Sequence, residues 1–462
     1  MTWSLLRNRA DRRSTASGAR PVRSRLHLLP LEDRVVPSTT LHVDDDLRQY
    51  PAAGFTSIQA AVDAAQAGDV IRVHPGSYDE IVTVDKTLTL IGSGPAAVLR
   101  TGNPRQEAVV QGVNTNPLGI INLQADDVVL RGFTVQANTD GPGVFTHPAF
   151  SGYLIEGNLV WRNNPVGNPV PNTPSGGLHL NSSGDRPTVV QGNAFKDHTA
   201  ESFGDGVYTE LVVHNARIEG NYFEGNVHYS IDLAGSESST GFPGFEGPYP
   251  RSSNVVITDN TIERSGGVLV QYADDVEVSN NRIMHATRTG VYVGGRVNGV
   301  AVSNNTFSNA ANVVADGIHF GRHTGIFVGT LDIPGEITGV LVSGNTIQGH
   351  LNGIWLAGDA ADPGIGVVSG VTVENNTIRQ SRQHGILLTG AIGNVIRGNV
   401  TDHNHLDGIH VDATSTGNTF SANSARHNGG FDVYDESTGD GTYGTANTWT
   451  DDNVFRTSYF AG

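Results

Sequence analysis

An asparagine recurs at short intervals through the last two thirds of this 462-residue chain. Each copy follows a short apolar alternation and precedes another, as in "GVLVSGNTI" and "GVTVENNTI". The tightest spacings between successive copies are 21 to 24 residues. The repeated residues are Asn158, Asn193, Asn221, Asn260, Asn281, Asn305, Asn345, Asn376, Asn399 and Asn423. This repetition predicts a solenoid whose repeats pack mainly on their neighbours.

The pattern inside each repeat decides the kind of solenoid. Each unit carries two or three runs of three to five residues with period-two alternation, separated by Gly and Asn, and shows no helical periodicity. Three short strands per turn describe a parallel β-helix. We expect its continuous core to contain Val371, Val373, Ile378, Ile386 and Leu388.

The repeated asparagines have a structural interpretation. A sharp corner between strands needs a residue that tolerates the left-handed backbone region, and Asn is the non-glycine residue best suited to it. Asparagines stacked in successive coils can also join their amides in a hydrogen-bonded ladder. We therefore assign these residues to the fold and not to catalysis.

The two ends of the repeat carry different sequences. The segment "TSIQAAVDAAQAGD", residues 56–69, has a Thr/Ser start, apolar residues at helical spacing and Gly68 as a stop. It predicts an amphipathic helix that closes the core. Near the C-terminus, "GTYGTANTWTDDNVF" departs from the pattern, and we expect it to cap the other end.

The segment "TSIQAAVDAAQAGDVIRVHPGSYDEIVTVDKTLTLIGSG", followed by N-x-[IF] repeats, resembles the right-handed parallel β-helix, pectin-lyase-like superfamily, including its carbohydrate-binding and sugar-hydrolase repeat proteins. The resemblance covers residues 42–450. It implies an all-β, right-handed parallel β-helix with an N-terminal capping helix, over residues 41–462. It leaves the activity open, because such folds host many chemistries.

Residues 1–40 differ from the rest in charge. They carry eight Arg and three acidic residues, whereas the remainder carries 21 basic and 43 acidic residues. Such a basic segment is typical of disorder, but "LHLLPLEDRVVPS" resembles the LEPR-XLL segments of planctomycete surface proteins. That resemblance implies export, so we expect a secreted or cell-surface bacterial protein. The anionic remainder excludes nucleic acid as a partner, and it admits acidic polysaccharide only with a bridging cation such as Ca²⁺.

A second alignment, on Gly-apolar-x-apolar, defines one strand in each coil. Because side chains alternate along a strand, the third residue of each unit faces away from the core. These residues are His179, Tyr208, Asp232, Leu269, Tyr292, His319, Trp355, Leu387, His410 and Asp432. Aromatic rings beside carboxylate and imidazole groups suit sugar binding. The alternative is an ordinary outer sheet face.

Long insertions follow this strand after "SIDL", "GIHF" and "GIWL", which predicts a groove from Tyr208 to Trp355. We expect His179, Tyr208, Tyr292 and Trp355 to bind substrate. The titratable candidates in the groove are Asp232, Glu210, His228, Arg288, His319, Arg322 and His323.

Two reactions fit these groups. A lyase needs an Arg, Lys or His base and a cation that neutralises a uronate, which points to Arg288, His319 and Arg322. A hydrolase needs two carboxylates, for which Asp232 and Glu210 are the pair. A noncatalytic surface scaffold or adhesin remains the alternative function.

Other site chemistry is weaker. The segment "TDHNHLDGIHVD" gathers His403, His405, Asp407, His410 and Asp412, a set that can hold a divalent metal or form an exposed polar coil. The absence of Cys and the presence of only two Met disfavour copper handling. We expect no transmembrane segment and a monomer.

Overall fold

The computed structural model describes residues 38–112, 118–139, 141–164, 175–200, 203–235, 241–242, 245–246, 249–309, 323–330, 335–359, 362 and 365–454. Residues from Ser38 onward form one compact unit. The domain boundary at residue 40 stays a prediction, because residues 1–37 lie outside the described part of the chain.

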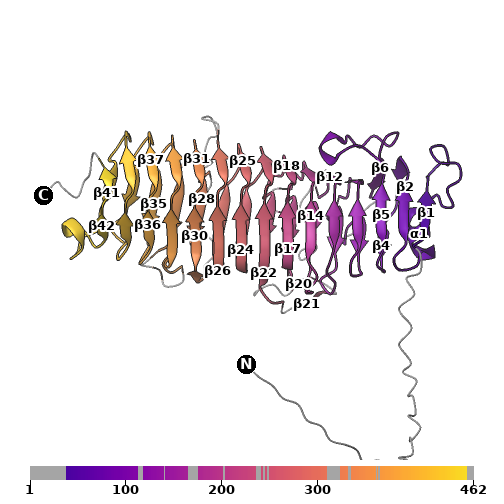
Figure 1. Ribbon diagram of the computed structural model, residues 1–462, viewed down its shortest axis with the longest axis horizontal. Coiled ribbons are helices and arrows are strands. Elements are labelled where there is room, and N and C mark those ends of the chain that lie inside the picture. The colour runs from indigo at the N-terminus through magenta and orange to yellow at the C-terminus, as the bar shows by residue number, and fades with distance from the viewer. Residues whose placement is uncertain are drawn as a thin grey trace, which may run out of the picture. The chain divides into compact units, whose positions relative to one another are not determined.

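The described strands stack in parallel, coil upon coil, from β1 to β42 and β43 (Figure 1). They form three faces. The first face consists of β1 (Thr40–Val43), β2 (Val70–Val73), β5 (Thr89–Gly92), β8 (Val129–Arg131), β11 (Leu154–Glu156), β14 (Thr188–Gln191), β17 (His214–Glu219), β22 (Ser252–Thr258), the later parts of β24 (Val268–Ser279) and β26 (Val291–Ser303), β29 (Ile337–Thr338), β30 (Val340–Ser343), β33 (Val371–Glu374), β36 (Val395–Arg397), β39 (Thr419–Ser421) and β42 (Thr448–Thr450).

The second face is a separate 14-stranded sheet. It consists of β3 (Gly76–Tyr78), β6 (Ala108–Gln111), β9 (Thr134–Gln136), β12 (Leu159–Trp161), β15 (Ala194–Lys196), β18 (Tyr222–Glu224), β23 (Thr261–Glu263), β25 (Arg282–Met284), β27 (Thr306–Ser308), β31 (Thr346–Gln348), β34 (Thr377–Arg379), β37 (Val400–Asp402), β40 (Ser424–Arg426) and β43 (Asn453–Val454).

The third face carries the predicted binding column. It consists of β4 (Val82–Val84), β7 (Ile121–Leu123), β10 (Val144–Thr146), β13 (Leu178–His179), β16 (Val207–Thr209), β19 (Ile231–Leu233), the first parts of β24 and β26, β28 (Ile326–Gly329), β32 (Ile354–Ala357), β35 (Ile386–Thr389), β38 (Ile409–Val411) and β41 (Val433–Asp435). Strands β24 and β26 run on across one corner and so join the first and third faces into a single hydrogen-bonded sheet.

The apolar residues of the three faces meet in one continuous core. Val371, Val373, Ile378, Ile386 and Leu388 all lie in it, fully or almost fully buried, as predicted. The alternation that buries them leaves their polar neighbours on the outside. The all-β parallel solenoid predicted from the repeat is therefore confirmed.

The repeated asparagines form the predicted ladder. In each coil the side-chain amide donates to the next asparagine's Oδ1 and to a backbone carbonyl of the preceding coil. Asn281, for example, donates to Asn305 Oδ1 at 3.0 Å and to the carbonyl of Ile257 at 2.9 Å. The row begins at Asn158 and ends where Asn423 donates to Asp452. Because every amide is buried and paired, the ladder fixes the register of the coils.

The ladder asparagines do not form the left-handed corner that was predicted for them; the residue before each of them does. The left-handed conformation belongs to the residue before each ladder asparagine, with φ of 56° at Asp259, Asn280, Asn304 and Asn375. Glycine takes the same place in other coils, as at Gly344. The first residue therefore makes the turn, and the second turns its amide inward to pair.

The N-terminal cap agrees with the prediction, whereas the C-terminal segment keeps the coil pattern that it was expected to break. Helix α1 (Ile58–Ala64) is shorter than the predicted segment, with Ser57 as its N-cap, and it buries Ile58 and Val62 against the core. At the other end, β42 and β43 continue the coil pattern, and Trp449 stacks on Phe420 with ring centroids 3.8 Å apart. That segment is a further coil and not a break. Two short 3₁₀ helices, Ala97–Leu99 and Thr442–Gly444, and the hairpin of β20 (Gly241–Phe242) and β21 (Phe245–Glu246) complete the elements.

Candidate functional site on the third face

Strand register defines the outward column of the third face. Its successive Cα partners are Phe145, His179, Tyr208, Asp232, Leu269, Tyr292, Phe327, Trp355, Leu387, His410 and Tyr434. One predicted member is wrong, and another lies outside the described residues. Phe327 takes the place between Tyr292 and Trp355 at which His319 was expected, and the structure does not describe His319. Tyr434 replaces Asp432, whose carboxylate instead accepts hydrogen bonds from Asn428.

The column lies outside the core but is not an exposed stripe. His179, Tyr208, Asp232 and Tyr292 are only 0 to 6% exposed. The rings lie along their own strands: a Cβ at Gly294 would collide with the ring of Tyr292, and one at Gly329 with that of Phe327. Neighbouring rings then pack on each other and form a second apolar cluster of Tyr229, Leu269, Tyr292, Phe327 and Ala357, with Trp355 half-buried at its edge.

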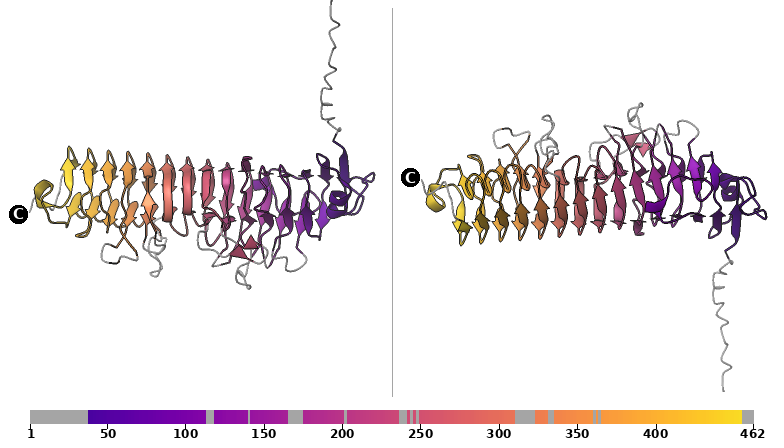
Figure 2. Two further views of the ribbon diagram at one scale, coloured as in Figure 1. Left: turned by 90° about the horizontal axis from the view of Figure 1, so that it is seen from below. Right: turned by 90° about the horizontal axis from the view of Figure 1, so that it is seen from above.

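The insertions follow the third face in part as predicted. Those after β19 and β32 leave from this face, and the β20–β21 hairpin projects from one side of the stack (Figure 2). The segment read as an insertion after "GIHF" contains β28, which is itself a strand of the third face. His319 and Arg322 lie outside the described residues, so their assignments stay predictions.

One charged cluster stands at the start of the third-face strands. His228 Nδ1 lies 2.9 Å from Asp205 Oδ1 and 3.7 Å from Asp232 Oδ2. Asp205 precedes β16, His228 precedes β19, and Asp232 lies within β19. The backbone N–H of Tyr229 also donates to Asp205 Oδ1 at 2.8 Å. Two neighbouring coils thus hold one imidazole between two carboxylates.

Burial sets the electrostatics of this cluster. Burial and the nearby Asp205 raise the pKa of Asp232 well above its ordinary value. Burial lowers the pKa of His228, but the charge and hydrogen bond of Asp205, together with Asp232, outweigh it and leave that pKa raised. Burial, with the charge of Glu210 next, raises the pKa of Tyr208. These surroundings therefore favour the protonated forms of Asp232 and of His228.

The side of the cluster that reaches solvent is cationic and aromatic. The His228 side chain is 21% exposed, whereas those of Asp205 and Asp232 are 0 and 3% exposed. The ring of Phe203, a residue 37% exposed, lies 6.2 Å from His228. Arg288 donates from Nε to the carbonyl of Val227 and lies over the ring of Tyr229. A ligand arriving here meets an imidazole, a guanidinium and an apolar ring.

Part of this site was predicted from the sequence, namely His228, Asp232, Glu210 and Arg288. His228 and Arg288 precede their strands and Asp232 lies within β19, whereas Glu210 follows β16 at the other end. Asp205 was not predicted. An Asp-Gly pair stands directly before a third-face strand at Asp205 and again at Asp407. That recurrence is the signal that points to Asp205.

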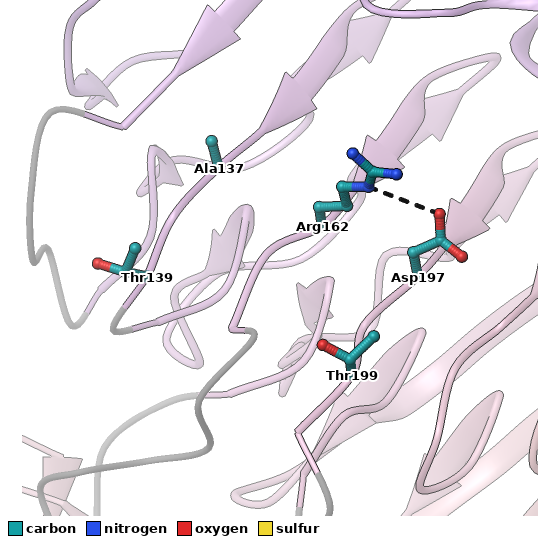
Figure 3. Close-up of a pocket in the computed structure, with 5 residues that line it drawn as sticks. All are labelled: Ala137, Thr139, Arg162, Asp197 and Thr199. Carbon is teal, nitrogen blue, oxygen red and sulfur yellow. Dashed lines mark ion pairs between the residues drawn. The ribbon is translucent and has the colours of Figure 1, made fainter.

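A pocket of about 530 Å³ lies at another corner, after strands of the second face (Figure 3). Its lining includes Arg162 and Asp197, whose Nε and Oδ2 atoms lie 3.7 Å apart. Trp161 donates to the same Asp197 oxygen, and the Arg162 guanidinium lies over the Trp161 ring. These charged groups are engaged with one another, so we place the candidate site at His228.

The histidine-rich segment does not form one cluster. Asp402, His403 and His427 gather at one corner, whereas His384, Asp407 and His410 gather on the third face. Asp412 accepts hydrogen bonds from Thr414 and Ser415 and serves a turn. The five residues therefore do not form one metal site.

Family comparisons agree with the fold. The family described as right handed beta helix region matches residues 214–368, and the family described as periplasmic copper-binding protein (NosD) matches residues 312–455. No curated protein gives a sequence match. The chain is a right-handed parallel β-helix protein.

The chain superposes on solved structures at low sequence identity. The catalytic unit of the GH87 α-1,3-glucanase from Streptomyces thermodiastaticus strain HF3-3 superposes with a TM-score of 0.57 and 16% identity, over 86% of this chain and 66% of the glucanase. The A-module of a mannuronan C-5 epimerase from Azotobacter vinelandii gives a TM-score of 0.36 and 14% identity, over 87% and 93%. Within the described residues, no helix is long and apolar enough to cross a membrane.

Proposed function

We propose that this protein binds polysaccharide on the third face around His228 and cleaves it by acid–base chemistry. The observation that carries the proposal is the solvent-reaching imidazole of His228, held at 2.9 Å by the buried carboxylate of Asp205. A carboxylate at Nδ1 orients the ring and leaves Nε2 to exchange a proton with a ligand. Phe203 offers a ring face for a sugar.

Elimination is the reaction that these groups favour. His228 in its neutral form takes the proton at C5 of a uronate, and Arg288 pairs with the uronate carboxylate and stabilises the charge that develops there. The bond from C4 to the glycosidic oxygen breaks, and a C4–C5 double bond forms. The imidazolium can pass the proton to the departing oxygen, so one residue serves as base and acid.

Hydrolysis fits the geometry less well. It requires two carboxylates that reach the substrate on either side of the glycosidic bond. Asp205 and Asp232 are buried behind His228. The GH87 α-1,3-glucanase shares the fold with this chain. A neutral glycan is therefore the alternative substrate, with hydrolysis as the reaction.

The overall charge of the protein bears on the substrate. A chain with a net charge of −17 repels a polyuronate at long range. We therefore expect activity on an acidic polysaccharide to rise with Ca²⁺ or with salt. Export through residues 1–40 belongs to the same proposal, because polysaccharides of this kind lie outside the cell. We do not propose copper binding, because the chain has no Cys and only two Met.

The test incubates the full chain with neutral and acidic polysaccharides, with and without Ca²⁺. Unsaturated uronates and reducing ends are both measured. We expect unsaturated product, reduced about 100-fold or more in His228→Ala and Arg288→Ala. The matched controls His214→Ala and Arg264→Ala should cleave normally.

Other outcomes reassign the protein. Reducing ends without unsaturated product would overturn elimination and favour the Asp232 and Glu210 pair. Retention of a glycan without cleavage would favour a binding module, and Trp355→Ala would then weaken retention. Neither cleavage nor retention would favour the scaffold.

A further inference from the structure

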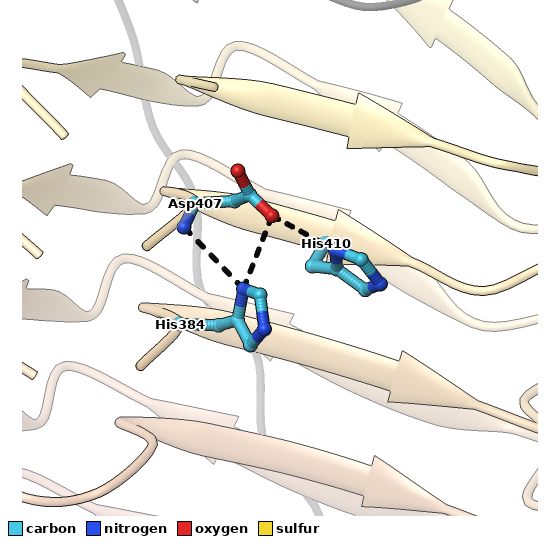
Figure 4. A group of neighbouring side chains, drawn as sticks. All are labelled: His384, Asp407 and His410. Carbon is cyan, nitrogen blue, oxygen red and sulfur yellow. Dashed lines mark hydrogen bonds and ion pairs between the residues drawn. The ribbon is translucent and has the colours of Figure 1, made fainter. Parts of the chain in front are cut away.

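A second polar cluster lies on the third face, six strands further along than Asp232. At about 4.8 Å per strand, the two are roughly 29 Å apart. His384 precedes β35, Asp407 precedes β38, and His410 lies within β38 (Figure 4). The cluster is therefore separate from the proposed cleavage site.

One carboxylate oxygen organises both imidazoles. Asp407 Oδ2 lies 2.9 Å from His410 Nδ1 and 3.3 Å from His384 Nδ1. The other oxygen, Oδ1, accepts the backbone N–H of Phe431 at 2.7 Å and so ties the carboxylate to the next coil. Asp407 is thus held in place by both imidazoles and by the next coil.

The outer nitrogens of the two rings remain for a ligand. Figure 4 shows that the second nitrogen of each ring points away from Asp407. The ring centroids are 4.4 Å apart, so the two imidazoles lie side by side on the sheet. Glu436, directly after β41, places Oε1 3.9 Å from His410 Nε2. The three side chains are 13, 17 and 38% exposed, which lets a small ion reach them.

We propose that His384 and His410 bind a divalent transition-metal ion of the Zn²⁺ type through Nε2, with Glu436 as third ligand and Asp407 as the carboxylate that orients both rings. Two imidazoles and one carboxylate are the ligand set that such ions prefer, and a carboxylate at the far nitrogen is their usual support. Ca²⁺ prefers six to eight oxygen ligands, and the cluster does not match it.

A second histidine pair provides the matched control. His403 and His427 also lie beside one carboxylate oxygen, that of Asp402, at 2.9 and 3.1 Å. Both imidazoles are 63% exposed, so holding an ion there would cost more side-chain conformational entropy than at the less exposed pair. We expect the more deeply set pair to bind first.

The test titrates Zn²⁺ into the chelator-treated full chain by calorimetry and records Co²⁺ absorption bands as a direct report of ligation. We expect one Zn²⁺ bound in the micromolar range or tighter. His384→Ala and His410→Ala should each weaken it more than about 100-fold, and Asp407→Asn by about 10- to 100-fold. His403→Ala should bind as the unchanged protein does.

Three results would overturn the proposal: no binding by the unchanged chain, unchanged binding in His384→Ala, or a loss confined to His403→Ala. Circular dichroism and urea unfolding establish that each variant is folded. If His410→Ala fails to fold, His384→Ala and Glu436→Gln decide, because both residues lie outside the strands. None of these readouts depends on polysaccharide cleavage, so failure here leaves the proposed function untouched.

Discussion

Removing one amide from the middle of the asparagine ladder should destabilise the solenoid strongly. Asn281 Oδ1 accepts hydrogen bonds from the backbone N–H and the side-chain amide of Asn260, at 3.0 and 2.9 Å. Its own amide donates to Asn305 Oδ1 and to the carbonyl of Ile257. Asn281→Ala removes these four hydrogen bonds from a buried site. At about 1 kcal/mol net for each, the free energy of unfolding should fall by about 4 kcal/mol.

The control is an amide pair of the same chemistry on the surface. Gln348 donates to Gln380 Oε1 at 2.7 Å between neighbouring coils, and both side chains are exposed. Water can replace that bond, so Gln348→Ala should lower the free energy of unfolding by less than about 1 kcal/mol. Urea unfolding compares the two, and amide hydrogen exchange at Asn260 reports the local opening, because solenoids need not unfold in one step. Equal effects of the two variants would refute the ladder as a source of stability.

Further predictions concern pH, the corner turn and the aromatic cluster. Asp205→Asn should lower the pKa of His228, because it removes the negative charge that raises this pKa. The cleavage rate should then rise at lower pH than in the unchanged protein. An unchanged pH profile would show that Asp205 has no part in the reaction. Burial lowers the pKa of His179 to about 3 and those of His198 and His350 to about 4, so the unfolded chain binds protons that the folded chain does not. The free energy of unfolding should therefore fall as the pH drops below about 6.5, by about 1.4 kcal/mol per pH unit for each histidine. His198→Asn places an asparagine between Asn163 and Asn226 and removes one of these histidines. It should reduce the loss of stability between pH 7 and pH 5, measured by urea unfolding. At the corner, Asn280→Val should cost about 1 to 2 kcal/mol and Asn280→Gly little, since φ is 56° there; equal urea midpoints would contradict this. Phe327→Ala should cost about 3 kcal/mol through lost contacts with Tyr292 and Trp355, again read by urea unfolding.

The repeat predicted the fold because apolar residues recur at a fixed spacing. Apolar residues such as Val373 and Ile378 recur at the same place in every coil, and only a stacked core uses all of them. The corner was harder, because "NN" and "DN" pairs offer two residues of similar chemistry. Only the backbone shows that Asn280 makes the turn while Asn281 pairs.

The sequence predicted that the side chains of the column point away from the core. It did not predict that they are buried, nor all of the residues that form the column. Both "GIHF" and "GIFV" have the pattern of a third-face strand, and register alone selects Phe327. Burial of Tyr292 arises because its ring lies over Gly294 and against Phe327, contacts between coils that alternation does not encode. The role of Asp205 was not predicted for a related reason. It contacts His228 from the preceding coil, 23 residues away in the sequence.

The asparagine ladder has a direction. Each amide donates toward the C-terminal end, from Asn158 to Asn423, so the amide dipoles add along the solenoid as peptide dipoles do along a helix. Their positive end meets the carboxylate of Asp452, which takes the final bond at 2.9 Å. An acid at this position offers the last amide an acceptor and needs no further coil beyond it, whereas an asparagine would present another donor. The ladder is thus a row of aligned amide dipoles whose positive end meets the side chain of Asp452.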